Sequence, residues 1–203
     1  MRRTKEEAEQ TRRAIMRAAL LTFNEVGISR TTLEHVAKSA GVTRGAIYWH
    51  FSDKQALLRA IREEVSLPLV DKADFTLLHD READPLDRIE RFLIDIVTMI
   101  DRDPHTRLAC SVMSFKCEYV GELEAELEEF ARKVEHTRKS LLKVYSEARK
   151  QKKLKAGLTP DAAALETTVF LAGLIRLMLL DAAPRVRRET RSLIATHIEG
   201  RRA

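Results

Sequence analysis

The sequence predicts an all-α protein. Apolar residues recur every three or four positions along most of its 203 residues, and the strict apolar-polar alternation of strands is almost absent. Three segments also begin with a cap residue followed by proline, a pattern typical of helix starts: Asp84-Pro85, Asp103-Pro104 and Thr159-Pro160. Charged residues make up 33% and apolar residues 44% of the chain, which indicates a globular protein rather than a disordered or membrane protein.

The first predicted helix covers about residues 5 to 26. Its apolar stripe consists of Ile15, Ala19, Phe23 and Val26, which share one face at helical spacing. Gly27 is expected to end this helix, because glycine readily adopts the left-handed conformation that closes many helix C-termini.

A helix-turn-helix is predicted over residues 32–54, TLEHVAKSAGVTRGAIYWHFSDK. Thr31 and Glu34 have the spacing of a capping box at the start of its first helix. Gly41 then permits a sharp turn, and Thr43 caps a short second helix that ends in Tyr-Trp-His. Two short helices around a glycine also occur as plain packing units. However, a Tyr-Trp-His run flanked by Arg and Lys is costly to bury and suits a polyanionic partner.

The second helix of this motif is predicted to read DNA. A recognition helix contacts bases through its N-terminal residues, so Arg44 can form a bidentate contact to guanine, and Gly45 lets the helix approach the duplex closely. Residues 1–54 carry ten Lys or Arg against six Asp or Glu, which also favours a polyanion. The expected DNA contacts are Thr31, Thr32, Thr43, Arg44, Gly45, Tyr48, Trp49, His50 and Lys54.

A linker helix is predicted over about residues 53–70. Ser52 and Gln55 have capping-box spacing at its start, and apolar residues then recur every four positions. Pro68 is expected to kink or end this helix, and the polar stretch DKADFTLLHDREAD is expected to mark a boundary. The predicted domains are a DNA-binding domain over residues 1–54 and a ligand-binding and dimerisation domain over residues 55–203.

Later predicted helices cover about residues 119–152, 161–181 and 185–199. The acidic segment ELEAELEE is interpreted as a solvated face, because its glutamates spread around the helix. The segment 161–181 is the most apolar, but Glu166 and Arg176 interrupt it and argue against a membrane span. A helix that is apolar on several faces must be covered on both sides. This predicts a homodimer in which the last two helices and their copies form a four-helix bundle.

Cys110 and Cys117 are the only cysteines. Seven residues apart on one helix, they would lie roughly 10 Å apart along its axis, too far for a disulfide. Together with an N-terminus, MRRTKEE, that leads into no apolar signal segment, this favours the cytoplasm. The six histidines show no pair at metal-ligand spacing, and no phosphate-binding glycine loop or nucleophile elbow is found. We therefore expect no metal, no cofactor and no enzymatic activity.

The helix that begins at Pro85 is predicted to have an apolar face wider than one neighbouring helix needs. This face consists of Leu86, Ile89, Phe92, Leu93, Ile96, Val97 and Ile100. Cys110, Met113 and Cys117 are expected to face inward if Lys116 faces outward. Ordinary core packing and a ligand pocket both fit these residues.

The segments VTRGAIYWHFSDK and TKEEAEQTRRAI resemble the DNA-binding end of the TetR family of repressors, in the AcrR-type branch that regulates multidrug efflux pumps. The resemblance is weaker downstream, at SFKCEY over residues 114–119 and GLIR over residues 173–176. It implies a nine-helix fold and a homodimeric repressor that binds a palindromic operator. Release would follow when an apolar or aromatic small molecule binds the C-terminal domain.

The same resemblance implies a ligand cavity between the fifth and eighth helices, with Arg176 as its polar anchor. With Cys117 added from its predicted inward position, the expected ligand-binding residues are Leu93, Ile96, Val97, Cys110, Met113, Ser114, Cys117, Thr137, Leu141, Thr168, Leu171, Ala172, Ile175 and Arg176. Two alternatives remain open: a thiol redox-sensing repressor that uses Cys110 or Cys117, and a DNA-binding protein that senses nothing.

Overall fold

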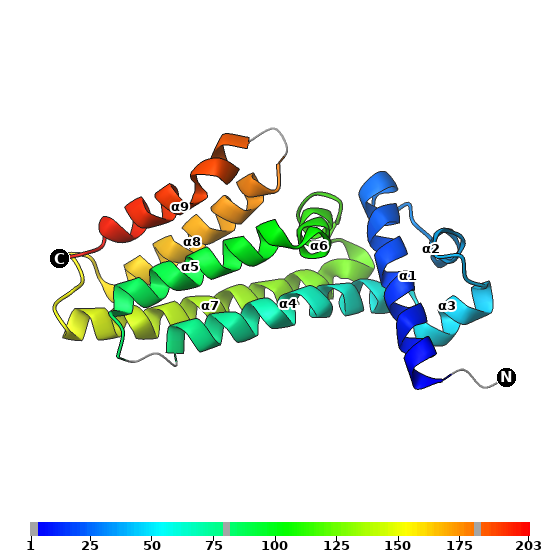
Figure 1. Cartoon of the computed structure of the whole chain (residues 1–203), viewed down its shortest axis with the longest axis horizontal. Coiled ribbons are helices and arrows are strands. Elements are labelled where there is room, and N and C mark those ends of the chain that lie inside the picture. Colours follow the sequence, from blue (N-terminus) through cyan, green and yellow to red (C-terminus); the bar gives the residue numbers. More distant parts are fainter. Residues whose placement is uncertain (1–3, 79–81, 181–183) are drawn as a thin grey trace. The chain divides into compact units, whose positions relative to one another are not determined.

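The computed structural model describes residues 4–78, 82–180 and 184–203 (Figure 1). Within these ranges the chain forms nine α-helices and one short 3-10 helix, and its only β-type pairing is an isolated bridge between Leu154 and Arg202. The predicted all-α fold is therefore confirmed. The chain divides into two compact units, one of Met1–Ser66 with Pro104–Leu127 and the other of Leu67–Asp103 with Glu128–Ala203. The predicted division into domains at residue 54 stays a prediction.

The first unit is built around α1, which packs against α2 and α6, while α2 packs against α3. Its core includes Ile15, Ala19 and Phe23 of the predicted stripe, all fully buried. Val26, the fourth member of that stripe, is exposed, so its predicted place in the core is wrong. The helices of this unit are α1 (Lys5–Val26), α2 (Leu33–Ser39), α3 (Arg44–His50), the first part of α4 (Lys54–Leu78), α6 (Pro104–Phe115), the 3-10 helix η1 (Gly121–Leu123) and the start of α7 (Glu124–Lys150).

Two predicted helix caps are shifted by one residue. Thr32, not Thr31, caps α2, because its hydroxyl accepts a hydrogen bond from the backbone N–H of His35. Asp53, not Ser52, caps α4 by accepting from the N–H of Ala56 at 2.7 Å. In both places a neighbouring residue of equal capping ability took the position that the backbone geometry required.

The linker helix α4 continues through position 68 and ends at Leu78, so the predicted end near residue 70 is wrong. The boundary predicted in the stretch DKADFTLLHDREAD is also wrong in its first part, which is helical. Thr76 and Leu77 are buried there. Tertiary packing of these side chains outweighs the local preference of proline and polar residues for a break.

The second unit contains the last part of α4, α5 (Pro85–Arg102), most of α7, α8 (Pro160–Met178) and α9 (Pro184–Glu199). Asp84 and Thr159 cap α5 and α8 ahead of proline, as predicted. In this unit α9 packs against both α5 and α8 (Figure 1). The core contains the whole predicted apolar face of α5: Leu86, Ile89, Phe92, Leu93, Ile96, Val97 and Ile100.

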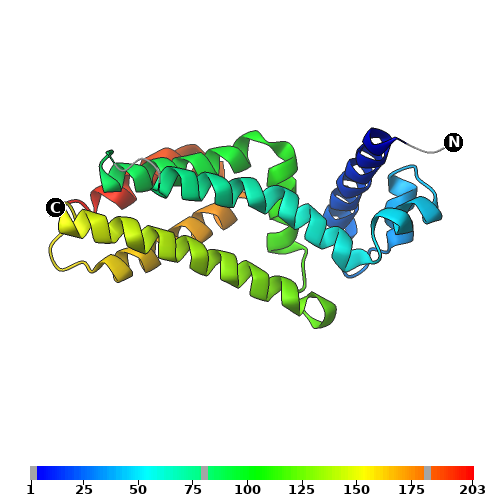
Figure 2. The same ribbon diagram turned by 90° about the horizontal axis from the view of Figure 1, so that it is seen from below.

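A polar network connects three helices of this second unit. On α7 the Tyr145 hydroxyl lies 2.7 Å from Thr167 Oγ1 of α8, which lies beside it in Figure 2. Thr167 Oγ1 is also 3.0 Å from His197 Nε2 of α9, and the His197 ring stacks on Phe170 with centroids 3.9 Å apart. Burial, with a smaller contribution from the positive charge of Arg201, lowers the pKa of His197 to about 4. His197 is therefore neutral at physiological pH.

In the acidic segment at the start of α7, Glu124 and Glu128 are exposed as predicted, whereas Glu126 differs from the predicted solvated face. Glu126 is only 5% exposed, and its carboxylate forms ion pairs with Arg62 and, at 3.4 Å, with Arg59. All three residues belong to the first unit, so the pair connects the start of α7 to α4. Spacing along the helix alone did not identify that Glu126 faces cations on a distant segment.

Candidate nucleic-acid interface

The recognition helix α3 contributes one buried side chain and an exposed face. Thr43 accepts a hydrogen bond from the N–H of Ala46 at 3.1 Å and thereby starts the helix. Ile47 is fully buried and anchors α3 to the first unit. Arg44, Gly45 and the Tyr48-Trp49 pair are exposed. The helix-turn-helix predicted from the sequence therefore leaves these four of its proposed contact residues accessible.

Burial within the described part of the first unit does not explain Trp49 or Gly45 on α3. Trp49 is 73% exposed, and its ring meets that of His50 edge to face at 4.5 Å. At Gly45 an added Cβ would find no heavy atom within 4 Å, so internal packing does not require glycine there. An exposed indole and an exposed glycine on one short helix suit a partner that comes close to this face.

Arg44 is held between two groups of the same unit. Its guanidinium Nη1 lies 3.0 Å from Glu34 Oε1 on α2, and its Cζ lies 5.8 Å from the centre of the Tyr48 ring on α3. The side chain remains 73% exposed. Sequence spacing assigns Glu34 to a helix cap, and the structure shows it paired with Arg44 instead.

The polar side-chain atoms of Thr31 and Lys54 form hydrogen bonds within the first unit and do not point freely to solvent. Thr31 is buried, and its hydroxyl donates to the carbonyl of Gly27 at 2.8 Å. The ammonium of Lys54 donates to three carbonyls of the turn between α1 and α2, those of Ile28, Ser29 and Thr31, at 2.8, 3.2 and 3.1 Å. These contacts tie the start of α4 to that turn. Nothing in the sequence pattern around Lys54 indicates this role.

Within the second unit, the residues expected to bind a ligand differ in burial. Leu93, Ile96, Val97, Leu141 and Leu171 are buried, whereas Thr137, Thr168 and Ile175 are partly exposed. Ala172 and Arg176 are exposed on α8. Cys110, Met113, Ser114 and Cys117 belong to the first unit and are partly exposed. Ligand binding by all of these residues stays a prediction.

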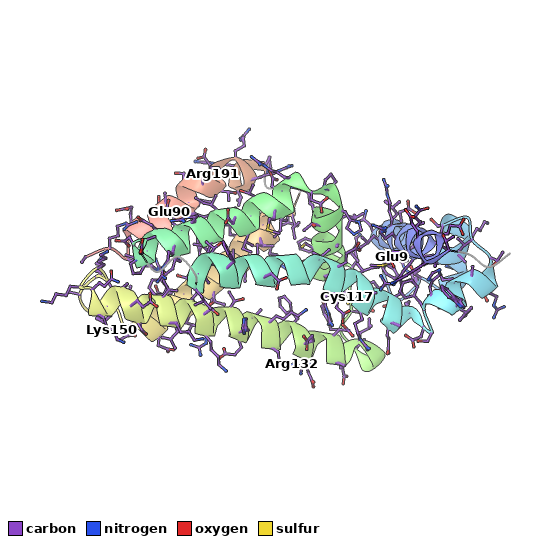
Figure 3. The ribbon with its side chains drawn as sticks, turned by 60° about the horizontal axis from the view of Figure 1, so that its bottom comes forward. Glu9, Glu90, Cys117, Arg132, Lys150 and Arg191 are labelled. Atoms are coloured by element: carbon purple, nitrogen blue, oxygen red, sulfur yellow. The ribbon has the colours of Figure 1, made fainter. Side chains whose placement is uncertain are left out.

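The two cysteines do not share one helix, because α6 ends at Phe115 and Cys117 lies in the segment that follows it (Figure 3). Both thiols are free. Burial raises the pKa of Cys110 to about 11, and burial is also the main reason why the pKa of Cys117 is raised. Since the thiolate is the reactive form, these surroundings do not activate either sulfur at neutral pH.

Large apolar side chains are exposed on α8 and in the segments around α9. Val169 is 64% exposed and Leu165 52% exposed, one helical turn apart on α8. Leu177, Leu180 and Leu193 are exposed as well. Among the described residues no helix is long and apolar enough to cross a membrane. Neighbouring exposed apolar side chains such as Leu165 and Val169 are typical of a contact with another protein surface.

A helix-turn-helix with an exposed recognition helix, followed by a larger helical unit, defines the class of DNA-binding transcriptional regulators. Residues 15–61 match the family described as "Bacterial regulatory proteins, tetR family", and residues 84–200 match the "MAATS-type transcriptional repressor, C-terminal region". The chain belongs to the TetR family of transcriptional regulators.

Individual relatives agree over most of the chain. It is 33% identical over 180 residues to the HTH-type transcriptional regulator TtgR of Pseudomonas putida, covering 89% of this chain and 85% of the relative. It is 34% identical over 209 residues to the HTH-type transcriptional regulator AcrR of Shigella flexneri, covering 98% and 92%. The crystal structure of NalD, the secondary repressor of the MexAB-OprM multidrug efflux pump in Pseudomonas aeruginosa, superposes with a TM-score of 0.84 at 29% identity over 98% of both chains.

Proposed function

We propose that this protein is a ligand-responsive repressor that binds a palindromic operator as a homodimer and controls a multidrug efflux pump operon. Apolar or aromatic small molecules release it from the operator. The observation that carries the proposal is the exposed Arg44, Gly45, Tyr48 and Trp49 face of α3, in a chain whose relative NalD represses an efflux pump. Because its proposed target is DNA, the proposed location of the protein is the cytoplasm.

The proposed DNA contacts follow from exposure and chemistry. Arg44 offers a bidentate fork to guanine, and the bare backbone at Gly45 allows a close approach. Tyr48, Trp49 and His50 offer donors to phosphates and sugars, as do the hydroxyl protons of Thr32 and Thr43. Thr31 and Lys54 are left out of this set, because their polar atoms already bond within the unit.

The proposed dimer forms through α8 and α9. Leu165 and Val169 on α8 and Leu193 on α9 expose apolar surface that a second copy would cover. Ala172 and Arg176 are exposed at the helical spacing that continues from Val169, so a substitution at either also tests the subunit contact.

The proposed inducer site uses the apolar residues of the second unit around Leu93, Ile96, Leu141 and Leu171. Their burial supplies the apolar environment that an aromatic inducer needs. The raised thiol pKa values give the redox-sensing alternative no support, and Cys110→Ser and Cys117→Ser variants with unchanged inducer response would agree with that.

Calorimetry on the full chain tests the whole proposal. The unaltered protein selects its preferred duplex from a random library, and planar aromatic compounds are then titrated with and without that duplex. A coupling of about 1 to 3 kcal/mol is expected, so that the duplex weakens inducer binding by the same factor by which the inducer weakens duplex binding. Equal affinity for every duplex would refute the proposal that the protein binds a specific operator as a repressor. Inducer affinity that is unchanged by the selected duplex would leave a DNA-binding protein that does not sense these compounds.

A further inference from the structure

We propose that Glu34 is a positioning residue that aligns Arg44 for base recognition and thereby raises the discrimination between operator and other DNA. The proposal rests on the proposed function, in which α3 contacts DNA. It assigns a role in sequence selection to an acidic residue on α2, at a surface that approaches a polyanion.

The geometry fixes the guanidinium from two directions. Glu34 Oε1 lies 3.0 Å from Arg44 Nη1 in an ion pair, and the centre of the Tyr48 ring lies 5.8 Å from Arg44 Cζ. These two contacts come from different helices, α2 and α3. An arginine side chain otherwise samples many rotamers, and a bidentate contact requires one of them. A carboxylate on one side and a ring on the other restrict that choice before DNA arrives.

The fold does not explain this ion pair. Both side chains are more than half exposed, at 73% and 55%, and exposed pairs contribute little to stability. Glu34 lies in the first turn of α2, where a negative charge is favourable, and Thr32 caps that helix, but neither effect requires a contact with Arg44. Alignment of Arg44 is the remaining effect of the contact.

The same carboxylate carries a cost for DNA binding in general. A negative charge beside α3 repels phosphates of any sequence and partly neutralises Arg44. On a matching guanine, the aligned guanidinium donates two hydrogen bonds to the base, and these offset the loss of binding free energy. Other DNA does not accept these two hydrogen bonds, so the loss remains. Glu34 therefore lowers the affinity for all DNA but raises the ratio between selected and unselected DNA.

The test compares Glu34→Gln with the unaltered full chain on two probes, the duplex that the unaltered chain selects from a random library and poly(dI–dC). Affinity for poly(dI–dC) should rise, affinity for the selected duplex should stay level or fall, and the ratio should drop roughly 3- to 10-fold. This is part of the roughly 5- to 150-fold discrimination that one bidentate pair supplies. Glu34→Asp keeps the charge but shortens the arm. It should lower the ratio while leaving the poly(dI–dC) affinity unchanged.

Glu9→Gln is the matched control. Glu9 lies on α1 (Figure 3), is about as exposed as Glu34, and pairs with Arg13 at 3.9 Å without contacting Arg44. Its removal changes the net charge equally and should leave the ratio unaltered. In an Arg44→Ala background, Glu34→Gln should also leave the ratio of the two DNA affinities unaltered, because the guanidinium that Glu34 aligns is absent.

Two results would overturn the proposal. One is an equal shift of both affinities by Glu34→Gln, which would show that Glu34 acts only through its negative charge and does not align Arg44. The other is an undiminished effect of Glu34→Gln without Arg44. If the unaltered chain itself shows no preference between the two probes, the proposed function fails, and this inference fails with it.

Discussion

Removal of the buried carboxylate of Glu126 is expected to destabilise the first unit strongly. The side chain of Glu126 is 5% exposed and that of its partner Arg62 is 12% exposed, so Glu126→Ala leaves a guanidinium that is largely shielded from water. Loss of one partner of a buried ion pair typically costs about 3 to 5 kcal/mol. Because Arg62 retains some exposure and can shift toward solvent, we expect about 2 to 4 kcal/mol.

The two cations around Glu126 make the effect asymmetric. Arg62→Ala leaves Glu126 with Arg59, which lies 3.4 Å away, so the expected loss is smaller, about 1 to 3 kcal/mol. Arg59 is 53% exposed, and Arg59→Ala should cost less than about 1 kcal/mol. Stability should therefore decrease from Arg59→Ala through Arg62→Ala to Glu126→Ala.

Urea unfolding at one fixed protein concentration measures this order, since association also contributes to the stability of a dimer. Glu128→Ala is the control: Glu128 forms an exposed i,i+4 pair with Arg132, and its loss should change the free energy of unfolding by less than about 0.5 kcal/mol. If Glu126→Ala is no more harmful than Glu128→Ala, the burial argument is refuted.

Three further predictions address DNA reading, association and pH. Arg44→Ala should cost about 1 to 3 kcal/mol of binding to the selected duplex and relax the preference at one base pair per half-site; equal losses on poly(dI–dC) in a titration would contradict base reading. Val169→Asp places a charge in the exposed apolar surface of α8 and should shift light scattering from dimer to monomer and weaken duplex binding; an intact dimer would exclude this surface. The pKa of His197 is lowered to about 4, so its neutral form stabilises the fold fully above the ordinary pKa of 6.5, and this stability is lost as pH falls from there toward 4. Because the ring is only partly buried, the loss is at most about 1 to 2 kcal/mol, and His197→Phe should flatten the dependence of the free energy of unfolding on pH over that window.

The fold followed from local patterns wherever one segment carried the whole signal. The stripe from Ile15 to Phe23 and the cap-proline pairs placed their helices correctly, because helix periodicity and capping act over a few neighbouring residues. At Thr31 the prediction failed by one residue, since Thr32 next to it can cap equally well. The choice between two such neighbours is made by packing, which buries Thr31.

In the candidate site, too, local sequence patterns do not reveal contacts that tertiary packing creates between distant segments. Arg44 and Trp49 are predicted as DNA contacts from their place in the motif, and the structure exposes both side chains. The roles of Lys54, Glu34 and Glu126 depend on partners from other segments, which sequence spacing does not reveal. Lys54, for example, bonds to carbonyls that precede it by more than 20 residues.

In α3, different residues anchor the helix and form its exposed face, and this separation affects how the exposed face can change. Ile47 is the only buried residue of this seven-residue helix, and Lys54 and Thr31 hold the surrounding scaffold together without using its outer face. Exchanges at exposed positions such as Arg44 or Tyr48 generally alter folding free energy by less than about 0.5 kcal/mol. Exchanges on the outer face of α3 can therefore change what this helix contacts with little effect on the folding of the first unit, although an exchange at Arg44 also leaves Glu34 without its partner.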